Sequence, residues 1–152
     1  MVLKNGYKIR KYQEEAKEAF EDFVENYMYE DGLGIGCLPT GAGKTRTSAG
    51  FVIDHLKKDP KNKVIWLAPE KEPVVQAIQT FVQELGSDDS LRRIGNGSNH
   101  PDIKCLKNDL DGQVFFGTLQ SWHKLNKKNK SKFKRYEKRL LIILDEAHWG
   151  VN

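Results

Sequence analysis

Residues 37–45 read CLPTGAGKT, a stretch whose small and basic residues suit the binding of phosphate groups. It matches the phosphate-loop pattern G-x-x-x-x-G-K-[ST] at Gly43, Lys44 and Thr45, although Leu38 replaces the first glycine. Small residues let backbone N–H groups approach phosphates, and a helix beginning at Gly43 would add the positive end of its dipole. We therefore expect a nucleotide-phosphate site made by Thr40, Gly41, Ala42, Gly43, Lys44 and Thr45.

Two carboxylates follow LLIIL, the most apolar stretch of the chain, at residues 140–144. A phosphate loop needs a second acid to hold its metal ion, and in phosphate-loop enzymes that acid follows an apolar strand. Asp145 would support Mg²⁺, to which Thr45 would offer its hydroxyl, while Lys44 would reach the β- and γ-phosphates. Glu146 would polarise the attacking water. Taken alone, the acidic pair could be a polar turn that closes a strand, but the phosphate loop upstream favours the catalytic interpretation.

The segments around these motifs alternate between helical and strand periodicity. Helices are predicted over residues 12–30, 43–58, 74–85, 101–110 and 119–125. Strands are predicted over residues 33–38, 64–68, 91–94, 113–117 and 140–144. In the helix that starts at Pro101, Ile103, Leu106 and Leu110 would share one face. Strands that read as continuous apolar runs between amphipathic helices indicate a three-layer α/β fold with a mostly parallel sheet.

Composition limits the class of protein. A chain of 152 residues with 38% hydrophobic and 30% charged residues predicts one globular domain over residues 1–152. No apolar run approaches the roughly 20 residues of a membrane span, and the first residues lack the apolar core of a signal peptide. Cys37 and Cys105 are too few for a disulfide framework or a zinc cluster, which favours reduced thiols in a cytoplasmic protein.

Positive charge is concentrated in residues 123–139, HKLNKKNKSKFKRYEKR, where Glu137 is the one acid. The net charge of +4 for the whole chain allows an anionic partner without requiring one. Such a run could contact nucleic acid. It could also be a solvated, mobile loop, because like charges repel and extend a chain, and the composition alone favours the loop.

LPTGAGKT together with DEAH at residues 145–148 resembles motifs I and II of helicase superfamily two, whose first motif often lacks the leading glycine. The resemblance implies a RecA-like phosphate-loop domain that binds ATP and Mg²⁺. It also implies that His148 links the ATP site to the nucleic-acid side. Gln13, in KIRKYQEEA, resembles the glutamine that reads adenine in this superfamily, although Lys11 stands where relatives often have proline. Its amide can donate and accept side by side, as the adenine edge requires.

Two further stretches resemble weaker motifs of the superfamily. VIWLAPEKEPVVQAI is similar to motif Ia, and GTLQSW is similar to motifs Ib and Ic. The resemblance implies backbone contacts with DNA or RNA, whereas ordinary loop and helix-start structure is the alternative. The residues concerned are Pro69, Lys71, Gln76, Thr118 and Gln120. The order of motifs is most similar to the helicase subunits of type I and type III restriction enzymes and to related DNA translocases.

In this superfamily ATP lies between two RecA-like domains, and the second domain supplies an arginine to the transition state. The sequence stops at Asn152, soon after motif II, so we expect a truncated first lobe that hydrolyses little ATP alone. We also expect an exposed sheet edge prone to association, and other restriction or modification subunits as partners. The alternatives are a nucleic-acid-binding module without turnover and, less favoured, a small-molecule kinase, because DEAH suits attack by water.

Overall fold

The structure is a computed structural model that describes residues 10–27, 43–95, 103–106 and 110–146. The helices are α1 (Lys11–Tyr27), α2 (Lys44–Lys58), α3 (Lys71–Leu85), α4 (Leu119–Lys124), α5 (Lys127–Lys132) and the 3₁₀ helix η2 (Phe133–Arg139). The strands are β1 (Lys63–Ala68), β2 (Leu91–Arg93), β3 (Val114–Thr118) and β4 (Leu140–Leu144). Among the described residues, no helix has both the length and the apolar character needed to cross a membrane.

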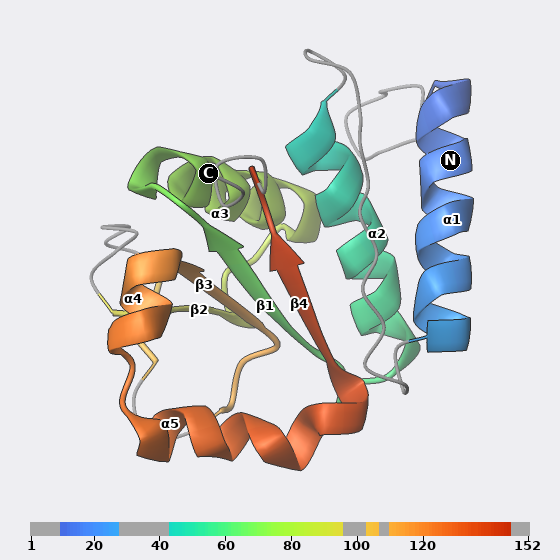
Figure 1. The fold of residues 1–152 in the computed structure, drawn as a ribbon. Helices are drawn as coiled ribbons and strands as arrows, with labels where there is room; N and C mark the ends of the chain where they lie inside the picture. Colours follow the sequence, from blue (N-terminus) through green and yellow to red (C-terminus); the bar gives the residue numbers. More distant parts are fainter. Residues whose placement is uncertain (1–9, 28–42, 96–102, 107–109, 147–152) are drawn as a thin grey trace.

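The described strands form one parallel sheet in the order β2-β3-β1-β4 (Figure 1). β1, the strand that follows α2, pairs with β3 on one side and with β4 on the other, so it lies inside the sheet. In the described part of the chain β4 is an edge strand, and Ile142 and Leu144 are each 51% exposed. The predicted strand at residues 33–38 lies outside the described residues, and the predicted association through a sheet edge remains a prediction.

Helices α2 and α3 cover one face of the sheet and enclose the larger apolar core. Trp66 of β1 lies at its centre with its ring 5.4 Å from that of Phe81 and 6.4 Å from that of Phe116. Every residue of β1 is buried, because this strand has neighbours on both sides and helices on both faces. The continuous apolar run in the sequence is the consequence of that position.

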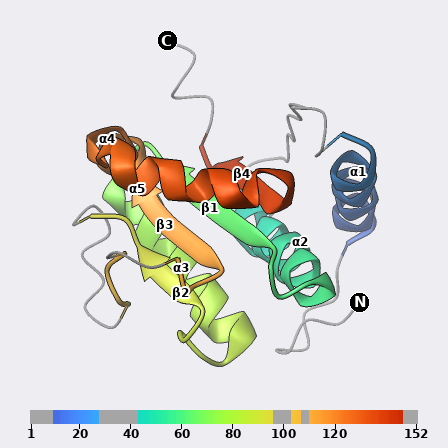
Figure 2. The same ribbon diagram turned by 90° about the horizontal axis from the view of Figure 1, so that it is seen from below.

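Helices α4, α5 and η2 cover the opposite face (Figure 2). Phe133, at the start of η2, is only 3% exposed and packs edge-on against Phe115 of β3 and Trp122 of α4. Ile65 and Leu67 of β1 belong to the same cluster. The predicted α/β fold with helices on both faces of a parallel sheet is confirmed.

Helix α1 packs on the outer side of α2 (Figure 1). The Lys17 ammonium pairs with the Asp54 carboxylate at 3.1 Å, and the rings of Phe20 and Phe51 stack at 5.4 Å. The hydrogen bond to Asp54 raises the pKa of Lys17 above its usual value. These contacts fix the height of α1 along α2, and with it the position of Gln13.

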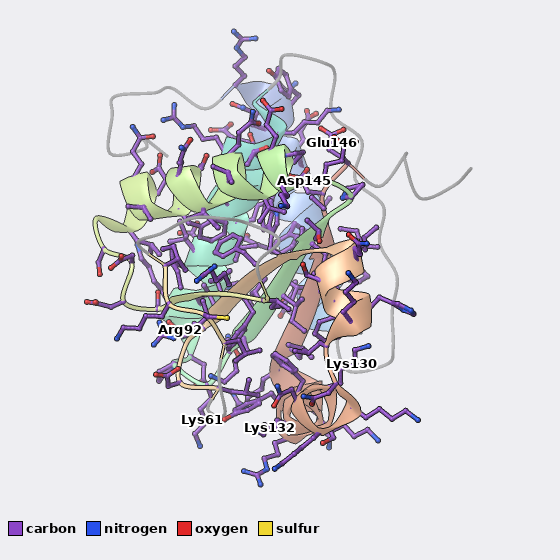
Figure 3. The ribbon with its side chains drawn as sticks, turned by 90° about the vertical axis from the view of Figure 1, so that its left-hand side faces the viewer. Lys61, Arg92, Lys130, Lys132, Asp145 and Glu146 are labelled. Carbon is purple, nitrogen blue, oxygen red and sulfur yellow. The ribbon has the colours of Figure 1, made fainter. Side chains whose placement is uncertain are left out.

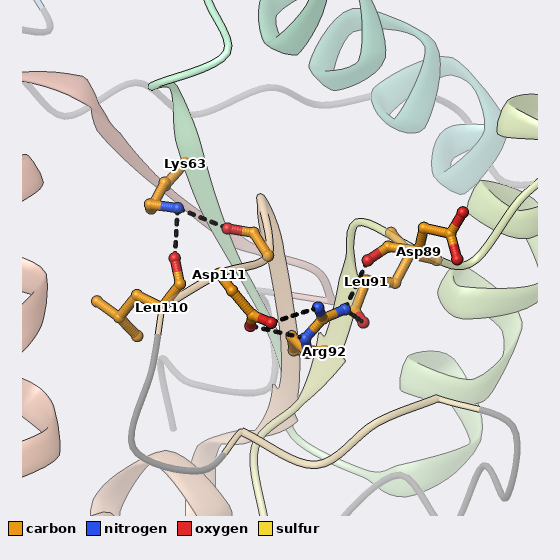
Figure 4. Close-up of polar contacts among 7 residues, drawn as sticks. Lys63, Asp89, Leu91, Arg92, Leu110 and Asp111 are labelled. Carbon is orange, nitrogen blue, oxygen red and sulfur yellow. Dashed lines mark hydrogen bonds and ion pairs between the residues drawn. The ribbon is translucent and has the colours of Figure 1, made fainter.

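Two buried cations stabilise the edge of the sheet at which the strands begin (Figure 4). The Lys63 ammonium donates to the carbonyls of Leu110 and Gly112 at 2.7 and 2.6 Å. The Arg92 guanidinium donates two hydrogen bonds to the Asp111 carboxylate, at 3.0 and 2.9 Å. Burial lowers the pKa of Lys63, and the Arg92 hydrogen bonds lower that of Asp111. Both cations therefore hold the turn that leads into β3.

The predicted helix over residues 101–110 is wrong within the described residues. Residues 103–106 are extended beside β2: the Arg93 N–H donates to the Lys104 carbonyl, and the Leu106 N–H donates to the Arg93 carbonyl. Ile103 joins the core under α2 and α3, whereas Leu106 joins the core on the other face. Residues three apart share a face on a helix but point to opposite faces in an extended chain. The apolar spacing fits both, and the sheet edge selects the extended form.

The interpretation of residues 123–139 as a mobile loop is also wrong. Most of this run is helical in α5 and η2, and the Asn126 side chain caps α5 by accepting from the Asn129 N–H at 2.8 Å. Phe133 is buried, and the Tyr136 ring lies 4.6 Å from the Lys63 ammonium. Residues three apart eclipse each other in a 3₁₀ helix, so both aromatic side chains can face the sheet. Contacts of these two residues with the sheet hold the run in place despite its many cations.

We predict that Phe133→Ala will lower the free energy of unfolding by about 3–5 kcal/mol, the usual range for a fully buried Phe. The matched change Lys134→Ala, at the next and exposed residue, should stay within about 0.5 kcal/mol of the wild type. Urea denaturation followed by circular dichroism measures both. Equal stability of the Phe133→Ala protein and the wild type would show that this helical run does not depend on Phe133 for docking.

Candidate nucleotide site

The start of α2 has the backbone geometry of a phosphate-loop end. Gly43 is exposed and has a φ of 69°, in the left-handed region that glycine adopts without strain. Its carbonyl accepts the Thr47 N–H at 2.9 Å, which begins the helix. Lys44 and Thr45 follow as the first two helical residues, where backbone N–H groups have no partners within the helix. Three residues of the predicted phosphate cradle, Thr40, Gly41 and Ala42, lie outside the described residues.

The acidic pair lies where β4 ends. The Asp145 N–H donates to the Leu67 carbonyl at 2.8 Å, which continues the pairing of β4 with β1 by one residue. The chain then turns sharply: Glu146 has a φ of 58°, and its N–H donates to the Asp145 carboxylate at 3.0 Å. A side-chain-bearing residue in the left-handed region is strained, and such strain clusters at functional sites. Figure 3 shows Asp145 and Glu146 together at this upper edge.

Burial raises the pKa of Asp145 above its usual value. The hydrogen bond from the Glu146 N–H opposes that rise, and the charge of Glu146 adds to it. The Trp66 indole and the charge of Lys44 both lower the pKa of Asp145. α2 ends at Lys58 and β1 begins at Lys63, so the chain reverses there and the start of α2 lies towards the edge at which β1 ends. Lys44 and Asp145 therefore lie on the same side of the molecule, although a hundred residues separate them in sequence.

Trp66 is a neighbour of Asp145 that no sequence motif indicates. Its side chain is fully buried, and no described residue accepts a hydrogen bond of normal geometry from its indole N–H. In the sheet Trp66 is aligned with Ile143, two residues before Asp145, so all three side chains point to the same face. Only the register of β1 against β4 reveals this proximity, and single-sequence patterns do not give that register.

Gln13 lies where α1 meets the start of α2. Its amide nitrogen donates to the Thr47 hydroxyl at 2.9 Å, and its amide oxygen accepts the Arg10 N–H at 2.9 Å. The amide nitrogen would be 3.7 Å from a Cβ atom placed on Gly43. Gln13 therefore lies next to Gly43, at the end of the predicted phosphate loop. A residue that contacts a bound nucleotide would need such a position.

The residues predicted to contact nucleic acid lie on two neighbouring strands and the helices that follow them. Pro69 follows β1, and Thr118 ends β3 in register with Ala68, so both lie at the edge that carries Asp145. Lys71, Gln76 and Gln120 are exposed. Thr118 is 5% exposed, and its hydroxyl caps α4 by accepting the Ser121 N–H at 3.0 Å. Contacts of these five residues with nucleic acid remain predictions.

The oxygen donors predicted for Mg²⁺ come from two elements, the Thr45 hydroxyl on α2 and the Asp145 carboxylate after β4. Oxygen donors are those that Mg²⁺ prefers, and it keeps several water ligands in such sites. Within the described residues no group of three or more His, Cys, Asp or Glu side chains is placed to hold a metal ion. The donor set fits a metal bound mainly by nucleotide phosphates and water. His148 lies outside the described residues.

The family model described as "Type III restriction enzyme, res subunit" matches residues 6–152. The chain belongs to this family. As a member of the restriction-enzyme res-subunit family, it also has relatives among eukaryotic DNA helicases. It is 27% identical over 151 residues to the DEAD-box ATP-dependent DNA helicase Fancm of Drosophila melanogaster. This match covers 97% of this chain and 9% of that protein.

A second relative is the putative ATP-dependent DNA helicase fml2 of Schizosaccharomyces pombe, 29% identical over 128 residues, or 84% of this chain and 16% of that protein. A third is the ATP-dependent DNA helicase mph1 of Sclerotinia sclerotiorum, 27% identical over 146 residues, or 84% of this chain and 12% of that protein. The chain thus spans less than a fifth of the length of these relatives. The predicted membership of helicase superfamily two, first lobe, is confirmed.

We predict that Asp145→Asn will stabilise this res-family chain in the absence of metal and nucleotide. Because burial raises the folded-state pKa of Asp145, the wild type loses stability as pH rises through that pKa. Asparagine removes this loss and keeps an acceptor for the Glu146 N–H. The gain should be about 0.5–2 kcal/mol near neutral pH, the range that single stabilising substitutions commonly reach. It should shrink as pH falls through the raised folded-state pKa of Asp145 towards about pH 4, the ordinary value for aspartate, below which the carboxyl is protonated in both the folded and the unfolded chain.

Urea denaturation at several pH values measures this effect. Asp89→Asn is the matched control, because Asp89 is an exposed carboxylate outside the site, and it should change stability by less than about 0.5 kcal/mol. A variant at Asp145 that is less stable than the wild type at every pH would contradict the account of Asp145 as a carboxylate buried for function.

Proposed function

We propose that this chain is the ATP-binding first lobe of a DNA-dependent ATPase of the helicase and translocase class. The observation that carries the proposal is that two motifs lie towards one sheet edge: α2 begins at Lys44 on the side where β1 ends, and Asp145 continues the pairing of β4 with β1 at that end. Family membership and DNA-helicase relatives support the same assignment. The names of these relatives favour DNA over RNA as the nucleic acid.

Each residue of the site has a role that its position supports. The first N–H groups of α2 and the ammonium of Lys44 would hold the β- and γ-phosphates of ATP. Mg²⁺, when bound, would neutralise charge on those phosphates, and the Thr45 hydroxyl and Asp145 carboxylate are the residues that would hold it. Gln13 would turn its amide from Thr47 to the adenine edge, which requires one donor and one acceptor side by side.

Hydrolysis requires a water molecule placed in line with the γ-phosphate and a group that accepts its proton. Glu146 is the candidate for this group because the left-handed turn at its own backbone places it directly beyond Asp145. The transition-state charge also requires an arginine, which a second RecA-like lobe would supply. That lobe, the coupling role of His148, and restriction or modification subunits as partners belong to this proposal, as does a cytoplasmic location.

A second candidate function is a DNA-binding module without turnover of its own. The observation that favours it is the exposed basic surface of α5 and η2, which lies away from the nucleotide site. The two functions differ in one measurable property. A binding module should bind DNA without binding ATP, whereas an ATPase lobe should bind ATP through Lys44.

We predict that Lys44→Ala will weaken binding of a fluorescent ATP analogue by about 10- to 150-fold, the equivalent of a charged hydrogen bond worth about 1.5–3 kcal/mol. Energy transfer from the tryptophans to the analogue measures binding in the presence of Mg²⁺. Lys57→Ala is the matched control, since Lys57 is an exposed lysine in the last turn of the same helix, and it should bind like the wild type. Unchanged binding by the Lys44→Ala protein would remove Lys44 from the nucleotide site.

We also predict that Gln13→Ala will reduce the preference for ATP over GTP. The wild-type amide would form a paired contact with adenine, and such contacts contribute about 1–3 kcal/mol to discrimination, or about 5- to 150-fold. Competition of unlabelled ATP and GTP against the fluorescent analogue measures the ratio. Gln79→Ala, at an exposed glutamine of α3, should leave the ratio unchanged. A ratio that is the same in the Gln13→Ala and wild-type proteins would exclude Gln13 from base recognition.

A further inference from the structure

The surface of α5 and η2 is the most highly charged part of the chain. Residues 123–139 hold nine lysines and arginines and one acid, a formal charge of +8. The whole chain carries +4, so the remaining residues together carry −4. The net positive charge of this protein therefore comes from a single segment, and most of that segment is helical.

The cations of this surface are held on a docked scaffold. Phe133 and Tyr136 attach η2 to the sheet, and the Lys130 ammonium donates to the His123 carbonyl and lies 5.6 Å from the Trp122 ring. Arg139 pairs with Asp59, which lies just beyond α2. A ligand that binds such a scaffold loses little affinity to ordering of the protein backbone.

Other cations of the surface pair with none of the acidic side chains that the structure describes. Among the described acidic side chains, none pairs with the exposed residues Lys127, Lys128, Lys134, Arg135 and Lys138. Arg135 and Lys138 are three residues apart in a 3₁₀ helix, so they lie in one row on its outer side. Repulsion among these cations destabilises the folded chain, and an extended polyanion would relieve it.

The surface lies at the opposite end of the strands from the nucleotide site. η2 runs directly into the first residue of β4, whereas Asp145 follows its last residue. Five strand residues at about 3.3 Å each separate the two ends by roughly 16 Å. Figure 3 shows Lys130 and Lys132 in the lower part of the molecule and Asp145 and Glu146 at the upper edge. The basic surface is therefore separate from the edge that holds Pro69 and Thr118.

We propose that α5 and η2 form a second DNA-binding surface, which holds the phosphate backbone of duplex DNA away from the motif-bearing edge. From Lys127 to Arg139 the two helices span roughly 23 Å, about seven base-pair steps of 3.4 Å. The large apolar side chains of the run, Phe133 and Tyr136, face the protein rather than solvent. Such a helix lacks an apolar face to insert into a lipid bilayer, so its charge fits a nucleic acid better than a membrane. The choice of DNA rests on the proposed function.

The test is the salt dependence of binding to a fluorescein-labelled duplex of about 20 base pairs, measured by fluorescence anisotropy. The variant K134Q/R135Q/K138Q removes three exposed cations and leaves Phe133 and Tyr136 in place. Each lost phosphate contact should reduce the slope of log K against log salt by about 0.9, so the slope should fall by about 2–3. Affinity at about 0.1 M salt should fall at least about tenfold.

The matched control is K11Q/K57Q/K58Q, which removes three exposed lysines from α1 and α2 on the other side of the sheet. It should keep the wild-type slope. Equal losses in both triple variants would indicate a general charge effect and would overturn the proposal, as would a wild-type slope in both. A third outcome would also overturn the proposal. If the wild type binds anionic phospholipid vesicles, and K134Q/R135Q/K138Q loses that binding but keeps the wild-type DNA slope, the surface binds a membrane.

Nucleotide binding, measured in parallel with the fluorescent ATP analogue, separates this inference from the proposed function. K134Q/R135Q/K138Q should bind the analogue like the wild type, and Lys44→Ala should keep the wild-type DNA slope. Loss of the slope in the triple variant, with normal nucleotide binding by the Lys44→Ala protein, would reject the ATP site and support this surface. Loss of nucleotide binding in Lys44→Ala, with a normal slope in the triple variant, would support the ATP site and reject this surface.

Discussion

The parallel pairing of β1 with β4 is the constraint on which the candidate site depends. The hydrogen bond from the Asp145 N–H to the Leu67 carbonyl extends that pairing to the last residue before the acidic turn. Because all described strands are parallel, their carboxyl ends meet at one edge, and the residues that follow them become neighbours. Pro69, Thr118 and Asp145 therefore share an edge although they are far apart in sequence, and α2, which leads into β1, begins on the same side.

Destabilising and stabilising features lie at opposite ends of the strands. At the edge that carries the candidate site, Asp145 is half-buried beside Trp66, and Glu146 has a strained backbone. At the other edge, Lys63 and Arg92 are buried but fully supplied with carbonyl and carboxylate partners. Proteins commonly tolerate unfavourable terms at a functional site because the rest of the structure offsets them. The contrast between these two edges is a physical reason to regard the first one as the site.

The sequence predicted the parallel sheet and both motifs because each rests on local patterns: long apolar runs, Gly43 before a helix, and two acids after a strand. It failed where distant residues decide the structure. The spacing of Ile103 and Leu106 suits a helix, yet hydrogen bonds with Arg93 hold that segment extended. The charge of residues 123–139 suggested a loop, yet burial of Phe133 against Phe115 keeps the run helical. Trp66 was missed because its proximity to Asp145 follows from strand register.

The central claim is that the start of α2 and the end of β4 form one ATP site. A crystal structure of the chain with Mg²⁺ and a non-hydrolysable ATP analogue tests it most directly. The account predicts that the phosphates will lie against residues 40–45. It also predicts a metal ion between the phosphates and Asp145, bound to the Thr45 hydroxyl. Phosphates bound on the basic surface of α5 and η2, with the start of α2 making no contact with the analogue, would contradict it.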